Sequence, residues 1–373
     1  MPQITQLQVW NIIARNNHLF IPDVIEDAIL SCLTEDIQTI EEAGEKLKEA
    51  FALLDRAATI DYDRPEIVDA YSLYYLRRNS LIPRIAIRDM ALNHSLQSFP
   101  EKVRVLDLGS GTGAVALGLL EMFLHPPFNT INIHVDAIDR SEACLKRLGQ
   151  HLKAAKLSNF SVNTMSFDIS DVDSLDMLLT SRGLYNLIFV ANLFNEIKEH
   201  AKSCEVLHCL SKHLADKAVI VIANAQRDFI KKLQPLLVAE SHRSGLSVYY
   251  PCPAHAPLTN ECWFWRQHDY DCRRLRQKSR RFILGSYRDQ LVALWLILCN
   301  KPLSIFDDYK LQYSNLDWGV FRFKQGDDSR YSDCEVCTSQ GIRQIGPQAM
   351  SVKRGAIVGC SANPFQVQQY VEL

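Results

Sequence analysis

Apolar residues recur at three- and four-residue steps in the first hundred positions of the chain. Over residues 40–54 the apolar positions are Ile40, Ala43, Leu47, Ala50, Phe51 and Leu54. Mainly Glu and Lys fill the positions between them, which is the pattern of an amphipathic helix. A second helical stretch is expected from Ile67 to Leu92, with a new section starting near Pro83 because proline suits the first turn of a helix. We therefore predict a helical N-terminal region over residues 1–98.

The spacing of apolar residues changes at Val103, from the helical steps of the first region to short continuous runs. The short apolar run Val103–Leu108 predicts a strand, and a glycine turn joins it to a predicted helix over Ala114–Met122. Further strands are expected over Ile131–Ile138, Val162–Phe167, Leu184–Ala191 and Ala218–Ala223. Helical patterns separate these strands, and this alternation predicts an α/β fold with a parallel, doubly wound sheet. We assign this sheet to residues 99–250.

Two further segments follow the predicted sheet. Residues 251–310 are rich in Cys, Trp and basic residues and include an apolar stretch, Leu291–Leu298. Residues 311–373 contain short runs typical of strands, namely Trp318–Phe323, Asp333–Thr338, Gly341–Ile345 and Ala356–Val358. These runs predict a small C-terminal β-domain.

The composition is that of an ordinary globular chain. Of the 373 residues, 47% are hydrophobic and 23% are charged, and the net charge is −2. No apolar run approaches the about 20 residues of a membrane span, so we expect no membrane partner, and we expect no DNA partner. Eleven cysteines are an odd number in a chain too large to need disulfides, which favours a reducing compartment. We expect the cytoplasm, or the mitochondrial matrix in a eukaryotic cell.

The turn after the first predicted strand carries the clearest chemistry. It reads DLGSGTGA over residues 107–114. Glycines allow the backbone to turn sharply and let a ligand approach it closely. Gly109, Gly111 and Ala114 also satisfy the dinucleotide fingerprint G-x-G-x-x-G/A, so the turn alone leaves the bound nucleotide open.

Two acidic residues favour S-adenosylmethionine (SAM) over a dinucleotide. Asp107 lies two residues before the first glycine, where an acid suits the cationic amino end of SAM and is a poor neighbour for a pyrophosphate. Asp139 ends the next strand, 26 residues after Gly113, where a carboxylate can accept hydrogen bonds from both ribose hydroxyls. Asp139 would serve NAD equally well, so Asp107 decides the interpretation. Asp136 and Asp173 are interpreted as solvated or capping groups.

These residues resemble the class I SAM-dependent methyltransferase family over Val103–Ala225. The resemblance implies a Rossmann-like methyltransferase sheet, with an acid beside the adenine after the third strand and further contacts at the tip of the fourth. The residues it assigns to the cofactor are Asp107, Gly109, Ser110, Gly111, Gly113, Asp139, Arg140, Asp168, Ile169 and Asn192.

No catalytic residue follows from the sequence. The tip of the fourth strand lacks the Asn/Asp-Pro-Pro-Tyr/Phe signature of amino-methylating relatives, and no cysteine pair matches the covalent 5-methylcytosine pattern. Asn195 and Glu196 face the methyl group in one interpretation and cap a helix in the other. Whether the chain transfers a methyl group or only binds the cofactor stays open.

Seven of the eleven cysteines lie after residue 250. Cys334 and Cys337 have the Cys-x2-Cys spacing of a turn that presents two thiolates to one metal. Iron–sulfur clusters take four such ligands. The alternative is a set of scattered, buried thiols.

A second resemblance rests on the SAM motif, the helical N-terminal region, a Cys-Pro segment, a basic helix and a distal Cys-Thr together. The chain resembles the mitochondrial small-ribosomal-subunit assembly methyltransferase-like family and its bacterial relatives. This implies a [4Fe-4S] cluster or zinc held by Cys252, Cys262 and Cys337. The family's remaining cysteine, expected between Cys252 and Cys262, is absent. Either Cys334 or Cys272 supplies the fourth ligand or the cluster is lost, and we favour Cys334.

A basic segment separates the early and late cysteines. Residues 266–301 carry nine Lys or Arg against three Asp or Glu, and most of the bases lie in 273–281. The run is either a solvated helix face or a surface that contacts phosphates. Trp263, Phe264 and Trp265 lie just upstream and are suited to stacking on bases, which favours RNA.

The sequence therefore predicts a SAM-binding, methyltransferase-like protein that acts on the small ribosomal subunit or its rRNA during assembly. The alternative is a SAM-dependent methyltransferase of a small molecule or a protein, with no RNA role. In that case the helical N-terminal region would be the lid over the substrate.

Overall fold

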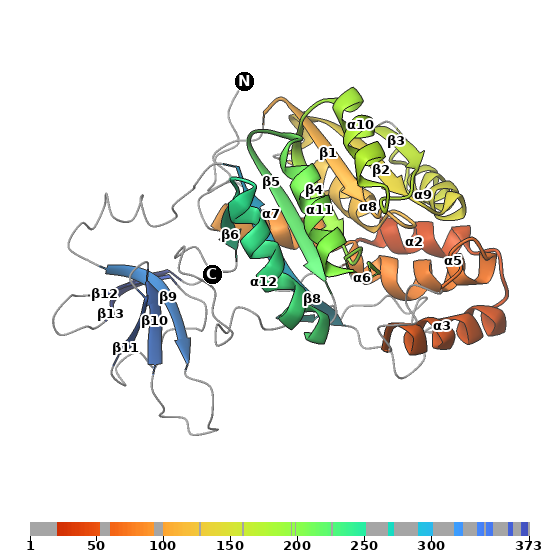
Figure 1. The fold of residues 1–373 in the computed structure, drawn as a ribbon. Coiled ribbons are helices and arrows are strands. Elements are labelled where there is room, and N and C mark those ends of the chain that lie inside the picture. Colours follow the sequence, from red (N-terminus) through yellow and green to blue (C-terminus); the bar gives the residue numbers. More distant parts are fainter. Residues whose placement is uncertain are drawn as a thin grey trace.

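The described part of the chain contains a helical N-terminal region, a main α/β sheet and a smaller β-sheet (Figure 1). The structure is a computed structural model. It describes residues 21–52, 60–92, 100–126, 128–158, 160–194, 196–197, 199–224, 227–250, 268–271, 290–300, 317–323, 334–338, 341–345, 357–360 and 367–371.

The main sheet has eight strands in the order β3-β2-β1-β4-β5-β8-β6, with β7 paired to β8. Strands β1 to β5 are parallel, whereas β8 runs antiparallel to β5, β6 and β7. The bounds are β1 Lys102–Leu108, β2 Asn132–Asp139, β3 Ser161–Ser166, β4 Tyr185–Ala191, β5 Leu214–Asn224, β6 Ser247–Tyr250, β7 His268–Asp271 and β8 Gln290–Cys299. The predicted α/β sheet is confirmed, and its five parallel strands lie where the apolar runs placed them.

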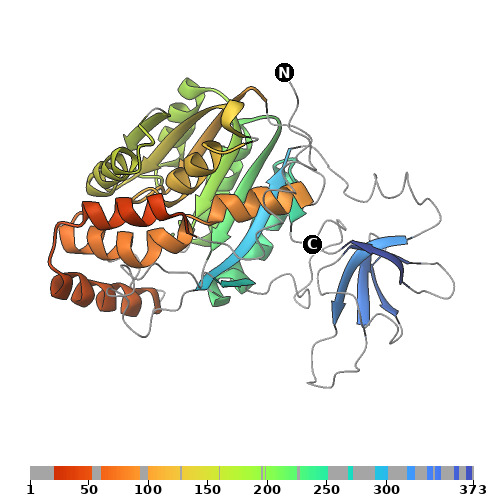
Figure 2. The same ribbon diagram turned by 180° about the vertical axis from the view of Figure 1, so that it is seen from behind.

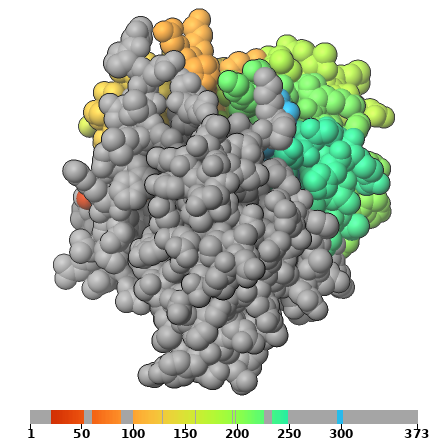
Figure 3. Space-filling model, turned by 90° about the vertical axis from the view of Figure 1, so that its left-hand side faces the viewer, coloured from red at the N-terminus to blue at the C-terminus, as the bar shows by residue number. Residues whose placement is uncertain are grey.

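Helices cover both faces of this sheet, as a doubly wound fold requires. On one face α8 and α9 pack with the N-terminal helices, and on the other face α10, α11 and α12 form a second apolar cluster. The bounds are α8 Ala114–Phe123, α9 Glu142–Ala154, α10 Val172–Arg182, α11 His200–Ser211 and α12 Arg227–Arg243. Val105 belongs to the first cluster and Leu106 to the second, because successive strand residues face opposite sides. In the space-filling view, the teal surface around residues 233–248 lies next to the green surface of the second face (Figure 3).

The described residues of the N-terminal region are helical, which confirms the predicted period. The bounds are α2 Asp23–Cys32, α3 Ile37–Ala52, α5 Pro65–Tyr71, α6 Arg77–Asn79 and α7 Ile82–Leu92, with a π-helix over Ser72–Leu76. Pro83 falls in the first turn of α7, as expected. Figure 2 shows α2, α3 and α5 stacked on one another below the sheet. No helix within the described residues is long and apolar enough to span a membrane.

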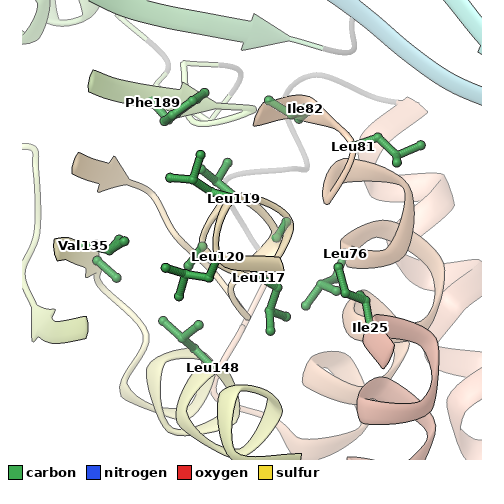
Figure 4. Packing of buried hydrophobic residues seen from close by; sticks show 14 of the residues in the cluster. Ile25, Leu76, Leu81, Ile82, Leu117, Leu119, Leu120, Val135, Leu148 and Phe189 are labelled. Atoms are coloured by element: carbon green, nitrogen blue, oxygen red, sulfur yellow. The ribbon is translucent and has the colours of Figure 1, made fainter. Parts of the chain in front are cut away.

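Helix α8 lies between the N-terminal helices and the sheet. Figure 4 shows Leu117 beside Leu76 and Ile25 of the N-terminal region, while Leu120 lies on the side of Val135 in β2. All ten residues of α8 are buried. At Gly118 the helix approaches the N-terminal region so closely that a Cβ atom there would overlap the backbone carbonyl of Ser80.

A buried ion pair also joins the two regions. Arg147 of α9 donates from Nη1 to Asp69 of α5, and both side chains are nearly inaccessible. The other carboxylate oxygen of Asp69 accepts hydrogen bonds from the backbone N–H groups of Thr34, at 2.7 Å, and Glu35, at 2.9 Å. The N-terminal region is therefore docked on the first face of the sheet by both apolar and charged contacts.

Two features of the main sheet differ from the predictions. The apolar stretch Leu291–Leu298 belongs to β8 and pairs with β5 and β6, so the sheet extends beyond the expected segment 99–250. Asp136 is not solvated but fully buried, and it accepts hydrogen bonds from Tyr185 Oη at 2.9 Å and Arg104 Nη2 at 3.1 Å.

The second sheet is antiparallel, in the order β11-β10-β9-β12-β13. The bounds are β9 Asp317–Phe323, β10 Cys334–Thr338, β11 Gly341–Ile345, β12 Ile357–Cys360 and β13 Val367–Val371. It provides the predicted C-terminal β-domain. Cys334 and Cys337 both lie within β10, paired with β9 and β11, so their backbone is an extended strand and not the turn expected from the Cys-x2-Cys spacing.

Candidate functional site

A cavity of about 440 Å³ lies at the carboxyl ends of β1, β2, β3 and β4. Ligands of open α/β sheets bind at this edge, and the volume falls in the range of small-molecule sites. Seven of the ten residues predicted to contact the cofactor line it, namely Gly109, Gly111, Asp139, Arg140, Asp168, Ile169 and Asn192. Asp107, Ser110 and Gly113 do not line the cavity.

The glycine turn has the backbone conformation that its sequence predicted. Gly109, Gly111 and Gly113 have φ angles of +74°, +51° and +99°, in the region that L-residues with side chains rarely adopt. The N–H groups of Gly109 and Ser110 both donate to the carbonyl of Ile138 at the end of β2, at 2.8 and 3.0 Å. The turn is therefore fixed against the neighbouring strand.

Close contacts explain why these positions need glycine. A Cβ atom at Gly109 would lie 2.9 Å from Leu193 Cδ1, and one at Gly113 would overlap the side chain of Leu148. Gly113 thus serves the packing of the turn against α9, whereas Gly109 and Gly111 face the cavity. Asn192, which follows β4 and also lines the cavity, has a positive φ of +59°, which asparagine tolerates better than most residues.

Asp139 connects the turn to the end of β2. Its Oδ2 accepts a hydrogen bond from the Gly111 N–H at 2.8 Å, and its Oδ1 accepts one from the Ser141 N–H at 2.9 Å. Burial raises the pKa of Asp139 above its usual range, although both hydrogen bonds oppose this shift. Each carboxylate oxygen keeps a further lone pair, so Asp139 is able to accept a ribose hydroxyl as predicted.

Asp107 lies beneath the turn and is only 1% exposed. Among the described residues, neither of its carboxylate oxygens has a hydrogen-bond partner of normal geometry. Burial, together with the nearby Asp139, raises its pKa to about 7. Because unpaired buried acids are unfavourable, Asp107 favours a cation nearby, but its influence on the cavity acts through the electric field and not by lining the wall.

His151 was not anticipated by the sequence and supports the turn from α9. Its Nδ1 lies 3.0 Å from the carbonyl oxygen of Thr112, and the side chain is fully buried. Burial lowers the pKa of His151 to about 4, so the ring is neutral and Nδ1 donates to that carbonyl. It positions the turn without contacting the cavity.

The N-terminal region supplies two further residues that the sequence reasoning missed. Tyr62 and Tyr71 line the same cavity as the glycine turn, and Tyr71 Cε1 lies 3.5 Å from where a Cβ would stand on Gly111. Tyr71 immediately precedes the π-helix over Ser72–Leu76. Such interruptions of α-helices occur frequently at functional sites, but no sequence pattern announced this one.

Glu196 follows β4 and lines the cavity. Its Oε1 accepts a hydrogen bond from Tyr62 Oη at 2.9 Å, and its Oε2 lies 3.7 Å from Arg140 Nη2. Burial raises the pKa of Glu196 to about 7, against the opposing effects of Tyr62 and Arg140. Of the two interpretations, the cavity-facing one applies to Glu196, while Asn195 lies outside the described residues.

The predicted metal ligands are not brought together by the described structure. Cys252, Cys262 and the alternative ligand Cys272 lie outside the described residues, as does the basic segment 273–281. The described residues do contain a group formed by Asp176, Cys209 and His213, whose potential ligand atoms lie within 4.8 Å of one another. His213 Nε2 lies 2.7 Å from Asp176 Oδ1, and Lys212 Nζ lies 3.3 Å from Oδ2, so hydrogen bonds and an ion pair account for this group.

Comparison with protein families identifies the segment that carries the cavity. Residues 100–272 match a family model described as a methyltransferase domain. No curated protein matches the chain. The match covers the glycine turn, the acids after β2 and β3, and Glu196, so the part of the chain that carries the cavity is similar to a methyltransferase domain.

Solved structures give weak likenesses. Precorrin-6y C5,15-methyltransferase from Geobacter metallireducens has 15% identity and a TM-score of 0.35, over 57% of this chain and 87% of that one. Magnesium protoporphyrin IX methyltransferase from Synechocystis, with bound SAM, has 12% identity and a TM-score of 0.36, over 72% and 99%. An rRNA methylase from Streptococcus thermophilus has 10% identity and a TM-score of 0.33, over 56% and 93%. Likenesses at this level do not identify a substrate.

Proposed function

We propose that the methyltransferase domain binds SAM in the cavity at the ends of β1 to β4 and is the cofactor-binding part of a methyltransferase. The observation that carries this proposal is the glycine turn. Its positive φ angles and missing side chains leave the backbone exposed to the cavity beside Asp139. The buried, unpaired oxygens of Asp107 fit a cationic ligand and would disfavour a pyrophosphate. The antiparallel β8 also sets the sheet apart from the 3-2-1-4-5-6 order of dinucleotide-binding domains.

The residues that line the cavity are proposed to contact different parts of the cofactor. In this proposal Asp139 accepts hydrogen bonds from the ribose, and Asp168 and Ile169, which line the cavity after β3, contact the adenine. Hydrogen bonds from Ser170 lower the pKa of Asp168, which keeps it ionised. When bound, SAM supplies a methyl group on a positively charged sulfur. The protein supplies proximity and alignment, and a base only where the acceptor carries a proton.

Titration calorimetry with SAM tests this assignment directly. The full-length protein is expected to bind SAM, and Gly109→Val is expected to abolish binding because its side chain would overlap Leu193 and enter the cavity. Gly245→Ala is the control, since Gly245 also has a positive φ, of +72°, but has open space around its Cβ position and lies away from the cavity. Absence of SAM binding by the unmodified protein would contradict the proposal.

We further propose that the substrate is the small ribosomal subunit or its rRNA during assembly. This rests on the resemblance to the ribosome-assembly family and on the basic segment 273–281 with the aromatic residues before it. Lys and Arg that neutralise phosphates give binding that weakens steeply with salt. Crosslinking of the protein to RNA in cells, followed by mapping of rRNA methylation in a deletion strain, tests partner and activity together.

A matched pair of charge reversals locates the RNA contact. Arg273→Glu with Arg274→Glu is expected to weaken rRNA binding at least tenfold and to flatten its salt dependence. Lys146→Glu with Lys153→Glu, on the exposed side of α9, changes the net charge equally and is expected to leave binding within about twofold. Equal losses in both double variants would show that only overall charge matters.

A second candidate function is methylation of a small molecule or a protein, with no RNA role. It is favoured by Tyr62 and Tyr71, because they show that the N-terminal region forms one wall of the cavity, as a lid over a small substrate would. Absence of rRNA crosslinks to the unmodified protein, with retained SAM binding, would favour this candidate.

We also propose that Cys252, Cys262 and Cys337, with Cys272 or Cys334 as the fourth ligand, hold a [4Fe-4S] cluster or zinc. Anaerobically purified protein is expected to contain about four iron and four sulfide, or one zinc, per chain. Cys262→Ser is expected to remove the metal, and Cys204→Ser, outside the proposed set, is the control. Metal-free protein after anaerobic purification would refute this part of the proposal.

A further inference from the structure

One wall of the cavity is built from aromatic rings and one carboxylate. Tyr62 and Tyr71 come from the N-terminal region, and Glu196 comes from the segment after β4. The two tyrosine rings meet edge to face, with their centroids 5.8 Å apart. This wall is made by parts of the chain that are about 130 residues apart in sequence.

A hydrogen bond fixes the carboxylate within this wall. Tyr62 Oη donates to Glu196 Oε1 at 2.9 Å, and Tyr62 is itself 9% exposed. The backbone carbonyl of Tyr62 accepts a hydrogen bond from Ser141 Oγ at 3.1 Å, next to Asp139. The N-terminal region therefore holds Glu196 in place with respect to the ends of both β2 and β4.

The negative charge around the cavity exceeds the positive charge that the described residues place there. Asp107, Asp139 and Glu196 are all buried or largely buried. Of the two cations that line the cavity, Arg140 is 49% exposed and stands 3.7 Å from Glu196, and Lys202 is paired with Glu205 at 3.5 Å. A cavity with aromatic rings and an excess of carboxylates attracts an organic cation.

We infer that Glu196, held by Tyr62 and flanked by Tyr71, forms the subsite for the sulfonium group of SAM. This inference rests on the proposed SAM site. It makes Glu196 and Tyr71 cofactor-contacting residues and Tyr62 a positioning residue. The raised pKa of Glu196 supports it, because a carboxylate of this kind gains most from a cation placed beside it.

The subsite has a measurable consequence for the reaction product. S-adenosylhomocysteine (SAH) shares the adenine, the ribose and the charged amino acid end of SAM and lacks only the methyl group and the positive charge on sulfur. Contacts made by Asp139 or Asp168 therefore act on SAM and SAH alike. A contact with the sulfonium acts on SAM alone and helps release the product.

Calorimetric titration of the full-length protein with SAM, SAH and sinefungin tests the inference. Sinefungin carries a primary amine in place of the S-methyl group, so it keeps a positive charge at this position. Glu196→Gln is expected to weaken SAM and sinefungin about tenfold while changing SAH less than about twofold, in line with the strength of a partly desolvated charge pair. Tyr71→Leu is expected to act in the same direction, and Tyr62→Phe to have a smaller effect.

Controls separate this inference from the proposed function. Glu101→Gln, at an exposed position just before β1 at the end of that strand away from the cavity, is expected to leave all three affinities unchanged, and far-ultraviolet circular dichroism checks that each variant folds. If the unmodified protein binds SAM but Glu196→Gln weakens SAM and SAH equally, or affects neither, the subsite is overturned while the SAM site stands. If the unmodified protein binds none of the three ligands, the proposed function fails as well.

Discussion

At the scale of single residues, two buried aspartates on adjacent strands have opposite environments. Asp136 is fully hydrogen-bonded, and although burial alone would raise its pKa, hydrogen bonds from Tyr185 and Asn163 and the neighbouring His134 lower it. Asp107 is equally buried and lacks such partners among the described residues, so its pKa is raised to about 7. Asp136 thus stabilises the fold, whereas Asp107 keeps an unfavourable charge beneath the cofactor turn.

The opposite pKa shifts predict opposite effects of pH on two matched variants. The folded state holds a proton on Asp107 that the unfolded chain loses above its ordinary pKa, so Asp107 lowers stability progressively as pH rises from that ordinary pKa to about 7, and the loss is constant above it. Asp107→Asn is expected to raise the free energy of unfolding of the unliganded protein at pH 8 by about 1–3 kcal/mol and to change it little at pH 4. Urea unfolding at both pH values measures this difference.

Asp136→Asn is the matched control with the opposite sign. Its lowered pKa stabilises the fold at pH values above the ordinary pKa of aspartate, and this stabilisation is lost as pH falls. The variant is expected to lose about 1–3 kcal/mol at pH 8 and less at low pH. Destabilisation by Asp107→Asn at pH 8 would contradict this prediction, because it would mean that the ionised carboxylate stabilises the folded protein.

Asp107 is also expected to make the proposed SAM binding depend on pH. A cationic ligand favours the ionised carboxylate, so the affinity for SAM is expected to rise between pH 6 and pH 8 as Asp107 loses its proton. Glu196, whose pKa is likewise about 7, contributes to the same rise. The rise should become shallower in Asp107→Asn and nearly vanish when Glu196→Gln is added. A flat profile for the unmodified protein would count against both assignments.

At the scale of secondary-structure elements, α8 decides how the N-terminal region meets the sheet. A glycine inside a helix normally destabilises it relative to alanine by about 0.5–1 kcal/mol. Gly118 lies where α8 approaches the Ser80 backbone so closely that there is no room for a methyl group. Backbone proximity here outweighs helix propensity.

Two glycine variants separate the effect of close backbone packing from the effect of helix propensity. Gly118→Ala is expected to lower the free energy of unfolding by about 1–3 kcal/mol, since the added methyl group must displace the Ser80 backbone. Gly149→Ala, inside α9 with nothing within 4 Å of its Cβ position, is expected to raise it by about 0.5–1 kcal/mol. Thermal and urea unfolding of both variants measure the effects, and the same sign in both would contradict the proposed contact.

The ion pair between α5 and α9 permits a second test at this scale. Arg147→Met leaves the buried Asp69 carboxylate without its cation and is expected to destabilise the protein by about 3–5 kcal/mol. Arg64→Ala, which breaks an ion pair whose arginine is 57% exposed, is expected to change stability by less than about 1 kcal/mol. Similar small effects in both variants would mean that the N-terminal region is docked by apolar contacts alone.

The elements with a clear period were predicted from the sequence, and those without one were not. The alternating strands and helices between Val103 and Ala223 were expected within a few residues of their observed bounds, because each pattern has one buried face. The run Leu291–Leu298 is apolar throughout, and such a run does not reveal which strand it pairs with. Asp136 was misjudged because burial of a charged residue depends on partners from other strands, such as Tyr185.

Only the part of the site that a local sequence pattern records was predictable. The glycine turn and the acids after β2 and β3 lie on adjacent strands of one motif, so local sequence placed them together. Tyr62 and Tyr71 reach the cavity through the docking of the N-terminal region, and no local pattern records that contact.

At the scale of the whole molecule, the main sheet is completed by a strand that lies far along the chain. β8 pairs with both β5 and β6 and continues the two apolar clusters through Ile297 and Leu298. The methyltransferase family match ends at residue 272, before this strand begins. The segment that folds as one sheet is therefore longer than the segment that the family model matches.

Truncated chains test whether the main sheet depends on β8. A chain ending at residue 250 keeps every parallel strand but leaves the edge of β5 unpaired, and open edges promote aggregation. It is expected to aggregate or to melt at a lower temperature than a chain ending at residue 302, with the full-length protein as reference. Scattering and thermal melting are the measurements. Equal behaviour of the two truncated chains would show that β8 adds little.

The late position of β8 in the sequence also affects how the protein folds during its synthesis. The strand β5 ends at Asn224 and its neighbour β8 ends at Cys299, so 75 residues are translated between the two. At the usual rates of synthesis this takes about 4–15 seconds, which is long compared with the folding of most small domains. The nascent chain must protect an apolar strand for that interval, so slow codons or chaperone binding sites are best sought between residues 225 and 290.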